Sequence, residues 1–404
     1  MYAKYAQQKA RKGSMKVGIL HDFKKYGGGG YQYSLSVISA LMTTNEHEYL
    51  IFCKDDEEFL HELEAIKPIF IGQEENLPFK LCSAALSLLN LRFPLGKYRV
   101  IKDIKPSLLI CPIPTLVGYS LKIPYIVTIH DLMHKFYPNF PEYSFRSRIS
   151  RDIIYSKSAR NAIFSIVDSE QGKEDLIHFY NIPEDKIKII SLIPPPYVYK
   201  YKDIEQTVVE ELLSKYDLPD NFIFYPAQFW SHKNHIRLLK ALHLIRKEHD
   251  AEIHIVFVGS PKEMFNKVMS LIKELKMDEQ VHYGGYSSNK ELVALYKKAI
   301  ALVYPSLAGP TNIPILESLV LGTPVVCSNL FSMPEQVGDA GLLFDPFDIE
   351  DMAEKIYKIW IDENLRKELT KKGYERVRNK NLTIENYAKK WEAVIEEALE
   401  IVKK

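Results

Sequence analysis

SLAGPTNIPILESLVLGTPVVCS, residues 306–328, is the stretch that decides the fold of this chain. It follows the β-rich run ALVYPS, so the pattern predicts a strand, a tight polar loop, a helix and a second strand. The helix is expected to open near Pro314, where a missing N–H costs nothing, and to stop at Gly322. A polar, glycine-containing loop before a helix exposes backbone N–H groups that suit an anion such as a diphosphate.

The same loop and helix carry candidate ligands for a sugar nucleotide. Gly309, Thr311 and Asn312 are expected to leave free backbone N–H groups at the helix N-terminus, where a diphosphate would bind. Glu317 is the one acid of this helix, and we expect it in the first turn. There its carboxylate could accept hydrogen bonds from two hydroxyls of a ribose.

Length and composition predict a soluble enzyme with two domains. A chain of 404 residues is too long for one ordinary core. Its 46% hydrophobic and 26% charged residues are ordinary for globular enzymes. Residues 1–200 carry 26 Lys and Arg against 21 Asp and Glu, while residues 201–404 carry 27 against 31. A mildly basic first half is compatible with an anionic acceptor or membrane surface, although ordinary scatter explains it equally well.

The sequence shows no signature of export or of a membrane span. The four cysteines are far apart, so they form no CxxC pair, and we expect a cytoplasmic protein. Residues 1–14 are polar and basic, which predicts an N-terminal extension and no signal peptide. The apolar residues 81–93 are too few to span a membrane. We expect a buried helix there, with an interfacial helix as the less favoured alternative.

Short apolar runs alternate with helical patterns along the chain, which predicts parallel sheets covered by helices on both faces. Seven strands are expected in the first half and six in the second, giving an α/β fold of two Rossmann-like, doubly wound domains. The expected strands are residues 17–20, 49–53, 68–71, 108–112, 125–130, 163–169, 187–192, 222–227, 253–259, 281–284, 301–306, 325–328 and 341–344.

The proline-rich residues 193–197 are expected to be neither helix nor central strand, so the domain boundary is placed at residue 200. The predicted domains are residues 15–200 and 201–383. A helix over residues 384–404 is long and amphipathic and could cross back to the first domain. In open α/β sheets ligands bind beyond the carboxyl ends of the strands, so strand ends of both domains are candidates for one shared site.

Two motifs follow expected strands of the first domain. Residues 27–30 are four glycines before a helix expected over residues 32–41, and they would leave several N–H groups exposed. A flexible turn is the simpler interpretation, and Tyr33 stands where a nicotinamide-type G-x-G-x-x-G needs its third glycine. His130 and Asp131 come at the end of a buried strand, where a histidine could donate to sugar hydroxyls.

A third motif, FWSHKNH, follows the strand expected over residues 222–227. Lys233 lies at the N-terminus of a helix expected to begin near Asn234. A lysine is a poor partner for the positive end of a helix dipole, so a bound phosphate would explain its position. Gln228 and His232 come from the same loop.

Several chemistries have no motif in the sequence. It contains no apolar-flanked Asp-x-Asp for a magnesium–diphosphate site and no G-x-x-x-x-G-K-[ST] P-loop. Basic residues do not gather with aromatic residues as in nucleic-acid-binding domains. We therefore expect no metal site and no nucleic-acid partner.

The motifs TIHDLMHKFYP, PAQFWSHKNH and GPTNIPILESLVLGTPVV resemble those of retaining GT-B glycosyltransferases of glycosyltransferase family 4, and the resemblance extends over residues 15–399. It implies transfer of mannose or another hexose from a GDP- or UDP-sugar to a glycan or lipid-linked acceptor in cell-surface polysaccharide biosynthesis. It also implies retention at the anomeric carbon and no metal. Peripheral contact with the cytoplasmic face of the membrane is a further expectation.

The resemblance also implies roles for individual residues. Lys233 would neutralise the donor diphosphate, Glu317 would hold the ribose and His130 would lie near the transferred sugar, so these three are the expected catalytic residues. No protein nucleophile is expected, since the leaving diphosphate would take the proton of the acceptor. The residues expected to bind the donor are Gly28, Gly29, Asp131, Gln228, His232, Asn234, Gly309, Pro310, Thr311, Asn312 and Ile313.

Two positions depart from the family pattern. Gly309 stands where the family has a glutamate that touches the sugar hydroxyls. Gln228 stands where the family has an arginine, so one positive charge is missing at the diphosphate. We expect polar neighbours to compensate: Thr311 and Asn312 at the sugar, and His232, Asn234 and loop N–H groups at the diphosphate.

Three alternative functions stay open. A GT-B nucleotide-sugar epimerase would share the fold and need no acceptor. A non-catalytic nucleotide-sugar-binding subunit of a polysaccharide assembly complex would explain both departures. A nicotinamide oxidoreductase is least favoured, because the third glycine of its fingerprint is missing.

Overall fold

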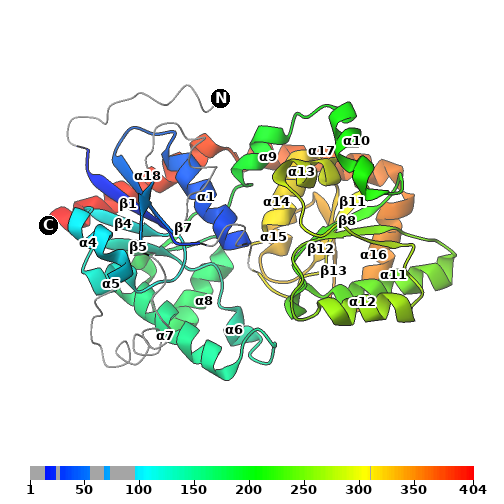
Figure 1. Cartoon of the computed structure of the whole chain (residues 1–404), viewed down its shortest axis with the longest axis horizontal. Coiled ribbons are helices and arrows are strands. Elements are labelled where there is room, and N and C mark those ends of the chain that lie inside the picture. Colours follow the sequence, from blue (N-terminus) through cyan, green and yellow to red (C-terminus); the bar gives the residue numbers. More distant parts are fainter. Residues whose placement is uncertain (1–13, 24–27, 55–67, 73–95, 310) are drawn as a thin grey trace. The chain divides into compact units, whose positions relative to one another are not determined.

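The structure of the protein is a computed structural model that describes residues 14–23, 28–54, 68–72, 96–309 and 311–404. Its described residues form two compact units (Figure 1). The first unit contains the chain up to Pro138, Phe145–Ile193 and Thr383–Lys404. The second unit contains Asn139–Ser144 and Pro194–Leu382.

The first unit is built on a parallel sheet of seven strands in the order β3-β2-β1-β4-β5-β6-β7. Val17 of β1 pairs with Tyr49 of β2 on one side and with Leu108 of β4 on the other. Because β1 and β4 are neighbours without being consecutive, the strand order reverses between them, which creates a ligand-binding position in doubly wound folds. The strands are β1 Lys16–His21, β2 Glu48–Cys53, β3 Ile69–Phe70, β4 Leu108–Cys111, β5 Tyr125–Thr128, β6 Phe164–Val167 and β7 Ile187–Ile189.

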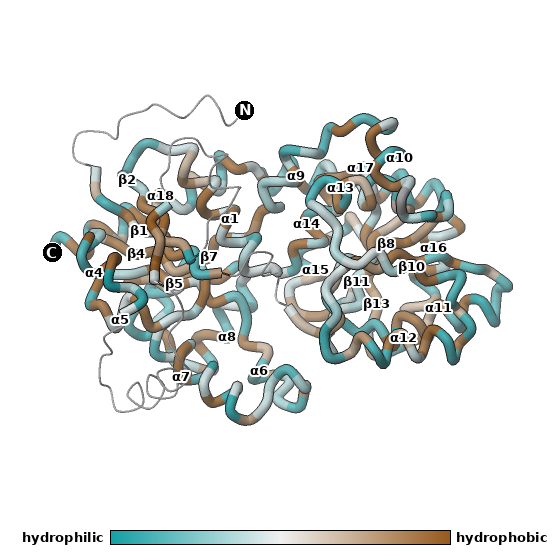
Figure 2. The backbone as a smooth tube through the Cα atoms, in the orientation of Figure 1, coloured by the Kyte–Doolittle hydropathy of each residue, from teal (hydrophilic) through white to brown (hydrophobic). Residues whose placement is uncertain are grey.

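The strands of this sheet are apolar along their length because helices cover both of its faces. Val17, Ile19 and Ile51 have no exposed surface, and Figure 2 shows hydrophobic colour along β1 and β4. Burying one such side chain contributes about 1.5–3 kcal/mol. The seven strands expected from the first half of the sequence are all present; β1 and β2 are slightly longer than predicted, and the other five are one to three residues shorter.

The C-terminal helix of the chain belongs to the first unit, where it packs against the first helix of the chain. Trp391 of this last helix is fully buried, and the carboxylate of Glu392 accepts hydrogen bonds from Thr44 and Tyr49. The first helix begins at Gly29, earlier than the residue 32 expected from the sequence. The helices are α1 Gly29–Leu41, α4 Arg99–Ile104, α5 Val117–Leu121, α6 Met133–Phe136, α7 Phe145–Asn161, α8 Glu170–Tyr180 and α18 Ile384–Lys403, with short 3₁₀ turns η2 Gly96–Tyr98 and η3 Glu184–Lys186.

The second unit repeats the same architecture with a parallel sheet of six strands, in the order β10-β9-β8-β11-β12-β13. Its strand order reverses between β8 and β11, where Leu302 pairs with Phe224. The six strands expected from the second half of the sequence are all present. They are β8 Ile223–Pro226, β9 Ile255–Val258, β10 Val281–Tyr283, β11 Ala301–Tyr304, β12 Val325–Ser328 and β13 Gly341–Phe344.

One expectation for the helices of the second unit is wrong. Residues 193–197 were expected to exclude a helix, but α9 begins at Pro196 within them. A proline is tolerated in the first turn because its missing N–H has no intrahelical partner there. The helices are α9 Pro196–Tyr201, α10 Gln206–Leu213, α11 His235–His249, α12 Phe265–Glu274, α13 Asn289–Lys298, α14 Ile313–Leu321, α15 Met333–Val337, α16 Ile349–Ile361 and α17 Glu363–Asn379, with 3₁₀ turns η4 Ser214–Tyr216 and η5 Ser231–Lys233.

Among the helices of the described residues, none combines the length and the apolar character that a membrane crossing needs. The apolar residues 81–93 lie outside the described residues.

Candidate active site

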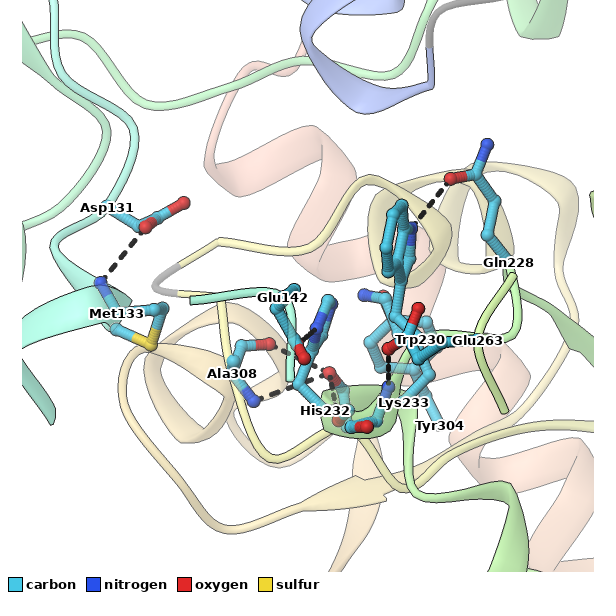
Figure 3. Close-up of polar contacts among 12 residues, drawn as sticks. Asp131, Met133, Glu142, Gln228, Trp230, His232, Lys233, Glu263, Tyr304 and Ala308 are labelled. Carbon is cyan, nitrogen blue, oxygen red and sulfur yellow. Dashed lines mark hydrogen bonds and ion pairs between the residues drawn. The ribbon is translucent and has the colours of Figure 1, made fainter. Parts of the chain in front are cut away.

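The strongest candidate site lies in the second unit, at the carboxyl ends of β8 and β11, where the strand order reverses. The loop after β8 carries Lys233, and the loop after β11 carries Gly309. The two loops are joined by hydrogen bonds to the carbonyl of His232, from the N–H of Leu307 over 2.7 Å and from the hydroxyl of Ser306 over 3.4 Å. Figure 3 shows how closely these loops approach each other.

Lys233 is held by two tyrosines that come from neighbouring strands. Tyr225 of β8 donates its hydroxyl to the backbone carbonyl of Lys233 over 2.6 Å. Tyr304, the last residue of β11, accepts a hydrogen bond from the lysine Nζ over 2.7 Å (Figure 3). Both tyrosines belong to the second sheet, and Lys233 itself comes shortly before the first residue of α11, His235. This is the position that the sequence predicts for a lysine that neutralises a diphosphate.

Gly309 adopts a backbone conformation that a glutamate would not readily take. Its φ angle is +107°, and a Cβ atom built there would lie 2.7 Å from Oδ1 of Asn312. Only glycine adopts such a φ without strain. A glutamate at this position would therefore be strained in the observed conformation of the loop.

The side chain of Asn312 is already bonded within the loop. Its Oδ1 accepts from the Tyr304 hydroxyl over 3.0 Å, and its Nδ2 donates to the carbonyl of Gly309 over 3.1 Å. The amide of Gln336 pairs with both the backbone N–H and the backbone carbonyl of Asn312, over 3.0 and 2.8 Å. The expectation that Asn312 presents a free N–H is therefore wrong, and its amide is engaged in shaping the loop.

Other groups in this loop keep their hydrogen-bonding capacity. The hydroxyl oxygen of Thr311 is buried without a partner, as far as the described residues show. Among the same residues, no acceptor is found for the backbone N–H groups of Thr311 and Ile313, which precede or open α14. Unpaired N–H groups at a helix N-terminus form an anion-binding site. Pro310 lies outside the described residues.

Glu317 lies deeper in α14 than expected, in the second turn instead of the first. It is 3% exposed, and its two oxygens accept hydrogen bonds from the hydroxyls of Tyr197 and Tyr296. Burial raises the pKa of the Glu317 carboxyl above its ordinary value, although the two tyrosine hydrogen bonds act in the opposite direction. Each carboxylate oxygen has a second lone pair, so a ribose hydroxyl would have to share these oxygens with the tyrosines.

Gln228 and Asn234, two more residues predicted to bind the sugar nucleotide, differ in the polar groups that they leave available. The Oε1 atom of Gln228 accepts from the indole N–H of Trp230 over 2.8 Å, which leaves the amide NH₂ of this glutamine without a partner among the described residues. Asn234 is buried, and its amide donates to the carbonyl of Pro346 and accepts from Arg237. The side-chain amide of Asn234 is therefore engaged with other residues of the second unit.

His232 contacts an acid that the sequence analysis missed. Its Nδ1 lies 2.6 Å from Oε1 of Glu142, a residue of the segment Asn139–Ser144 that belongs to the second unit (Figure 3). Burial would raise the pKa of Glu142, but hydrogen bonds from His232 and from backbone N–H groups outweigh it and lower that pKa. Glu142 lies 90 positions before His232, so no local pattern could have predicted the pair.

In the first unit, the predicted residues lie after β1 and β5. Gly28 precedes α1 with a φ of +79°, and Gly29 is the first residue of that helix. His130 donates its Nε2–H to the carbonyl of Pro112 over 2.9 Å. Burial lowers the pKa of His130, so the ring is neutral near pH 7 and only its Nδ1 is left, as an acceptor. In this structure His130 therefore offers a sugar hydroxyl an acceptor, where the sequence analysis expected a donor.

Asp131 has a structural contact that the sequence did not reveal. Its Oδ1 accepts from the backbone N–H of Met133 over 3.0 Å, at the start of α6 (Figure 3). This contact is typical of an aspartate that supports a turn.

The parts of the chain that the structure describes contain no group of three or more His, Cys, Asp or Glu side chains placed to hold a metal ion.

Comparison with known families assigns both halves of the chain. Residues 27–192 match the family described as Glycosyltransferase Family 4, and residues 210–376 match Glycosyl transferases group 1. The chain belongs to glycosyltransferase family 4. Together with the two parallel-sheet units, this gives the protein the GT-B fold, which confirms the predicted fold class.

One related sequence and two solved structures show what the chain is similar to. O-antigen chain mannosyltransferase B of Escherichia coli is 28% identical over 250 residues, which are 61% of this family 4 chain and 64% of that relative. The chain therefore spans less than two thirds of the relative's length. A glycosyltransferase from Rickettsia africae superimposes with a TM-score of 0.70 at 18% identity, over 96% of this chain and 99% of that one. Anabaena Alr3699/HepE in complex with UDP and glucose gives a TM-score of 0.73 at 14% identity, over 95% and 100%.

Proposed function

We propose that the protein is a retaining glycosyltransferase that transfers a hexose from a nucleotide-sugar donor to a glycan or lipid-linked acceptor. The observation that carries this proposal is the link from Lys233 through the Tyr304 hydroxyl to Asn312, which precedes α14, at the strand-order reversal of the second sheet. At the same helix start, the described residues offer no acceptor for the N–H groups of Thr311 and Ile313. One cation and several N–H donors at such a position suit a diphosphate.

The proposed chemistry stabilises the leaving group. As the bond between the sugar and the diphosphate breaks, negative charge grows on the diphosphate oxygens. Lys233, the amide NH₂ of Gln228 and the N–H groups of Thr311 and Ile313 would stabilise that charge from preorganised positions. The oxygen of the leaving diphosphate would accept the acceptor's proton while the new bond forms on the same face of the sugar. Glu317 would bind the ribose, and no metal ion would be needed.

For the sugar we propose mannose. The support is the similarity to O-antigen chain mannosyltransferase B, together with membership of family 4. We propose a GDP- or UDP-sugar as donor, and a growing cell-surface polysaccharide as acceptor. The neutral His130 of the first unit would contribute Nδ1 as an acceptor for a sugar hydroxyl.

A cytoplasmic location with peripheral contact to the membrane is proposed because a lipid-linked acceptor is anchored there and the first half of the sequence is mildly basic. Flotation with vesicles that contain anionic lipid, at low salt, tests it. Recovery of the protein with the vesicles, reversed by salt, is the expected result. Protein that stays at the bottom of the gradient contradicts membrane contact and leaves sugar transfer unaffected.

The central experiment measures binding of GDP-, UDP-, dTDP- and ADP-sugars by calorimetry, with EDTA present. We expect one base to bind tightly without metal. NMR of the transfer product with that donor should then show the anomeric configuration of the donor sugar. Failure of all four donors to bind overturns the proposed function, and an inverted product overturns the retaining mechanism alone.

A further inference from the structure

The donor loop of the second unit lacks the acid that the family motif places at position 309. A side chain at Gly309 would be strained, because its φ is +107° and a Cβ atom would lie 2.7 Å from Oδ1 of Asn312. The amide of Asn312 is engaged with Tyr304 and Gly309, so it does not replace a carboxylate. A sugar bound at this loop would therefore lack an anionic acceptor for its hydroxyls, unless another segment supplies it.

Such an acid is present on the segment Asn139–Ser144. This segment lies between α6 and α7 of the sequence but packs with the second unit, where Tyr143 is buried. The side chain of Glu142 is only 9% exposed and contacts Nδ1 of His232 through Oε1 over 2.6 Å. His232 in turn accepts the backbone N–H of Leu307, two residues before Gly309. Glu142 is therefore connected by two consecutive hydrogen bonds to the loop that lost its acid.

The second oxygen of Glu142 provides the independent observation. Its Oε2 is buried and has no hydrogen-bond partner within the described part of the chain. A buried carboxylate oxygen without a partner costs free energy, so native proteins normally pair it with a donor. The hydrogen bonds that lower the pKa of Glu142 keep it ionised at neutral pH, when it can only accept. A sugar hydroxyl is a suitable donor for such an oxygen.

We propose that Glu142 supplies the carboxylate that position 309 lacks, holding His232 with Oε1 and accepting a hydroxyl of the transferred sugar with Oε2. This inference rests on the proposed function, since it assigns a ligand within the same donor site. It makes Glu142 a residue that selects the hexose of the donor, separately from the residues that bind the diphosphate. The acid thus comes from the first half of the sequence, although it acts with the second unit.

Two substitutions separate the two contacts of Glu142. Glu142→Gln keeps the shape and an oxygen that can accept from His232, but it puts an NH₂ group in place of the accepting Oε2. Glu142→Ala removes both contacts. Glu363→Gln is the matched control, because it also removes one negative charge from a 2.6 Å ion pair, with Lys367 on α17, without any contact to the loop.

Calorimetry should compare each variant's affinity for the nucleotide sugar with its affinity for the corresponding nucleoside diphosphate. We expect Glu142→Gln to weaken binding of the nucleotide sugar about 10-fold or more, the effect of losing a charged hydrogen bond, while nucleoside diphosphate binding changes less than about 2-fold. Glu142→Ala should weaken binding of both ligands, because it also removes the contact between Glu142 and Nδ1 of His232. Glu363→Gln should change neither.

Each alternative result contradicts a defined part of the inference. If Glu142→Gln loses equal affinity for the nucleotide sugar and for the nucleoside diphosphate, the proposed contact with the sugar is overturned. If neither affinity changes, Glu142 has no role in donor binding, and the proposed function still stands. If the wild-type protein binds no nucleotide sugar, both proposals fail together. Thermal unfolding midpoints of the variants show whether a loss of affinity comes from misfolding, and Glu142→Gln, which conserves volume, should unfold near the wild-type temperature.

Discussion

Lys233 donates a hydrogen bond from Nζ to the hydroxyl oxygen of Tyr304 over 2.7 Å. The hydroxyl of Tyr304 donates in turn to Oδ1 of Asn312 over 3.0 Å. One buried tyrosine at the end of β11 thus connects the lysine of one loop with the asparagine that shapes the other. Because the tyrosine is part of the sheet, it orients the ammonium group before any diphosphate binds.

Replacing Tyr304 by phenylalanine tests this connection. The ring and its packing are conserved, but the lysine loses its acceptor and Oδ1 of Asn312 loses its donor. A neutral hydrogen bond contributes about 0.5–1.5 kcal/mol, so we expect donor affinity to fall roughly 2- to 10-fold. Calorimetry with the preferred nucleotide sugar measures it. Tyr199→Phe is the control, since its hydroxyl donates to the carbonyl of Leu382 outside the site, over the same 2.7 Å; equal effects of the two substitutions would argue against an orienting role.

Lys233→Ala should have a larger effect than Tyr304→Phe, because it removes the charge itself. A charged hydrogen bond contributes about 1.5–3 kcal/mol, which corresponds to a loss of about 10- to 150-fold in affinity. The nucleoside diphosphate and the nucleotide sugar should lose affinity equally, since the proposed contact is to the diphosphate. Lys262→Ala, which removes a lysine stacked on Trp230, is a control for the loss of one positive charge nearby. Wild-type affinity in Lys233→Ala would remove this lysine from the diphosphate site.

The fold was predictable because parallel strands leave a local signal. The run ALVYPS becomes β11 and the run VVCS becomes β12, since strands buried on both faces consist of consecutive apolar residues. The positions of Lys233 and of the loop before α14 follow from the same logic, because polar residues directly after such strands lie at the ligand-binding edge.

The hydrogen bonds of the site were not predictable, because they depend on contacts between distant residues. Nothing near Asn312 in the sequence reveals that Gln336, 24 positions later, occupies its backbone N–H. The burial of Glu317 between two tyrosines depends on Tyr197, which is 120 positions away. A glutamate in such a helix looks the same in the sequence whether ribose or tyrosine hydroxyls bond to its carboxylate.

Restoring the family glutamate at position 309 should damage the site. The φ of +107° strains any side chain, and a Cβ atom would meet Asn312 Oδ1 at 2.7 Å. We expect Gly309→Glu to lower donor affinity and the thermal unfolding midpoint, at a cost of about 1–3 kcal/mol for the strained backbone. Gly285→Ala is the control for strain alone, since Gly285 also has a positive φ but no atom within 4 Å of its Cβ position. Tighter donor binding in Gly309→Glu would show that the loop readily accepts the acid.

The raised pKa of Glu317 predicts how its contribution to stability changes with pH. Burial, the largest influence, makes the folded protein bind this proton more tightly than the unfolded chain, whose carboxyl titrates near 4.5. The contribution is therefore fully present below that value and is lost as pH rises through the raised pKa. Glutamine does not titrate. As pH rises from about 4 towards about 8, the thermal unfolding midpoint of Glu317→Gln should therefore increase relative to that of the wild type.

The exposed Glu363 provides the control of opposite sign. Its hydrogen bond with Lys367 lowers its pKa, so its contribution is present above the ordinary value and is lost as pH falls. The midpoint of Glu363→Gln should therefore fall behind the wild type, by a smaller amount, over the same rise in pH, because solvent screens an exposed pair. The midpoint of Glu317→Gln could instead fall behind the wild type as pH rises, as expected for Glu363→Gln. That result would show that the folded protein stabilises Glu317 as an anion, so that the hydrogen bonds from Tyr197 and Tyr296 outweigh burial. An anionic Glu317 would be a better acceptor for ribose hydroxyls.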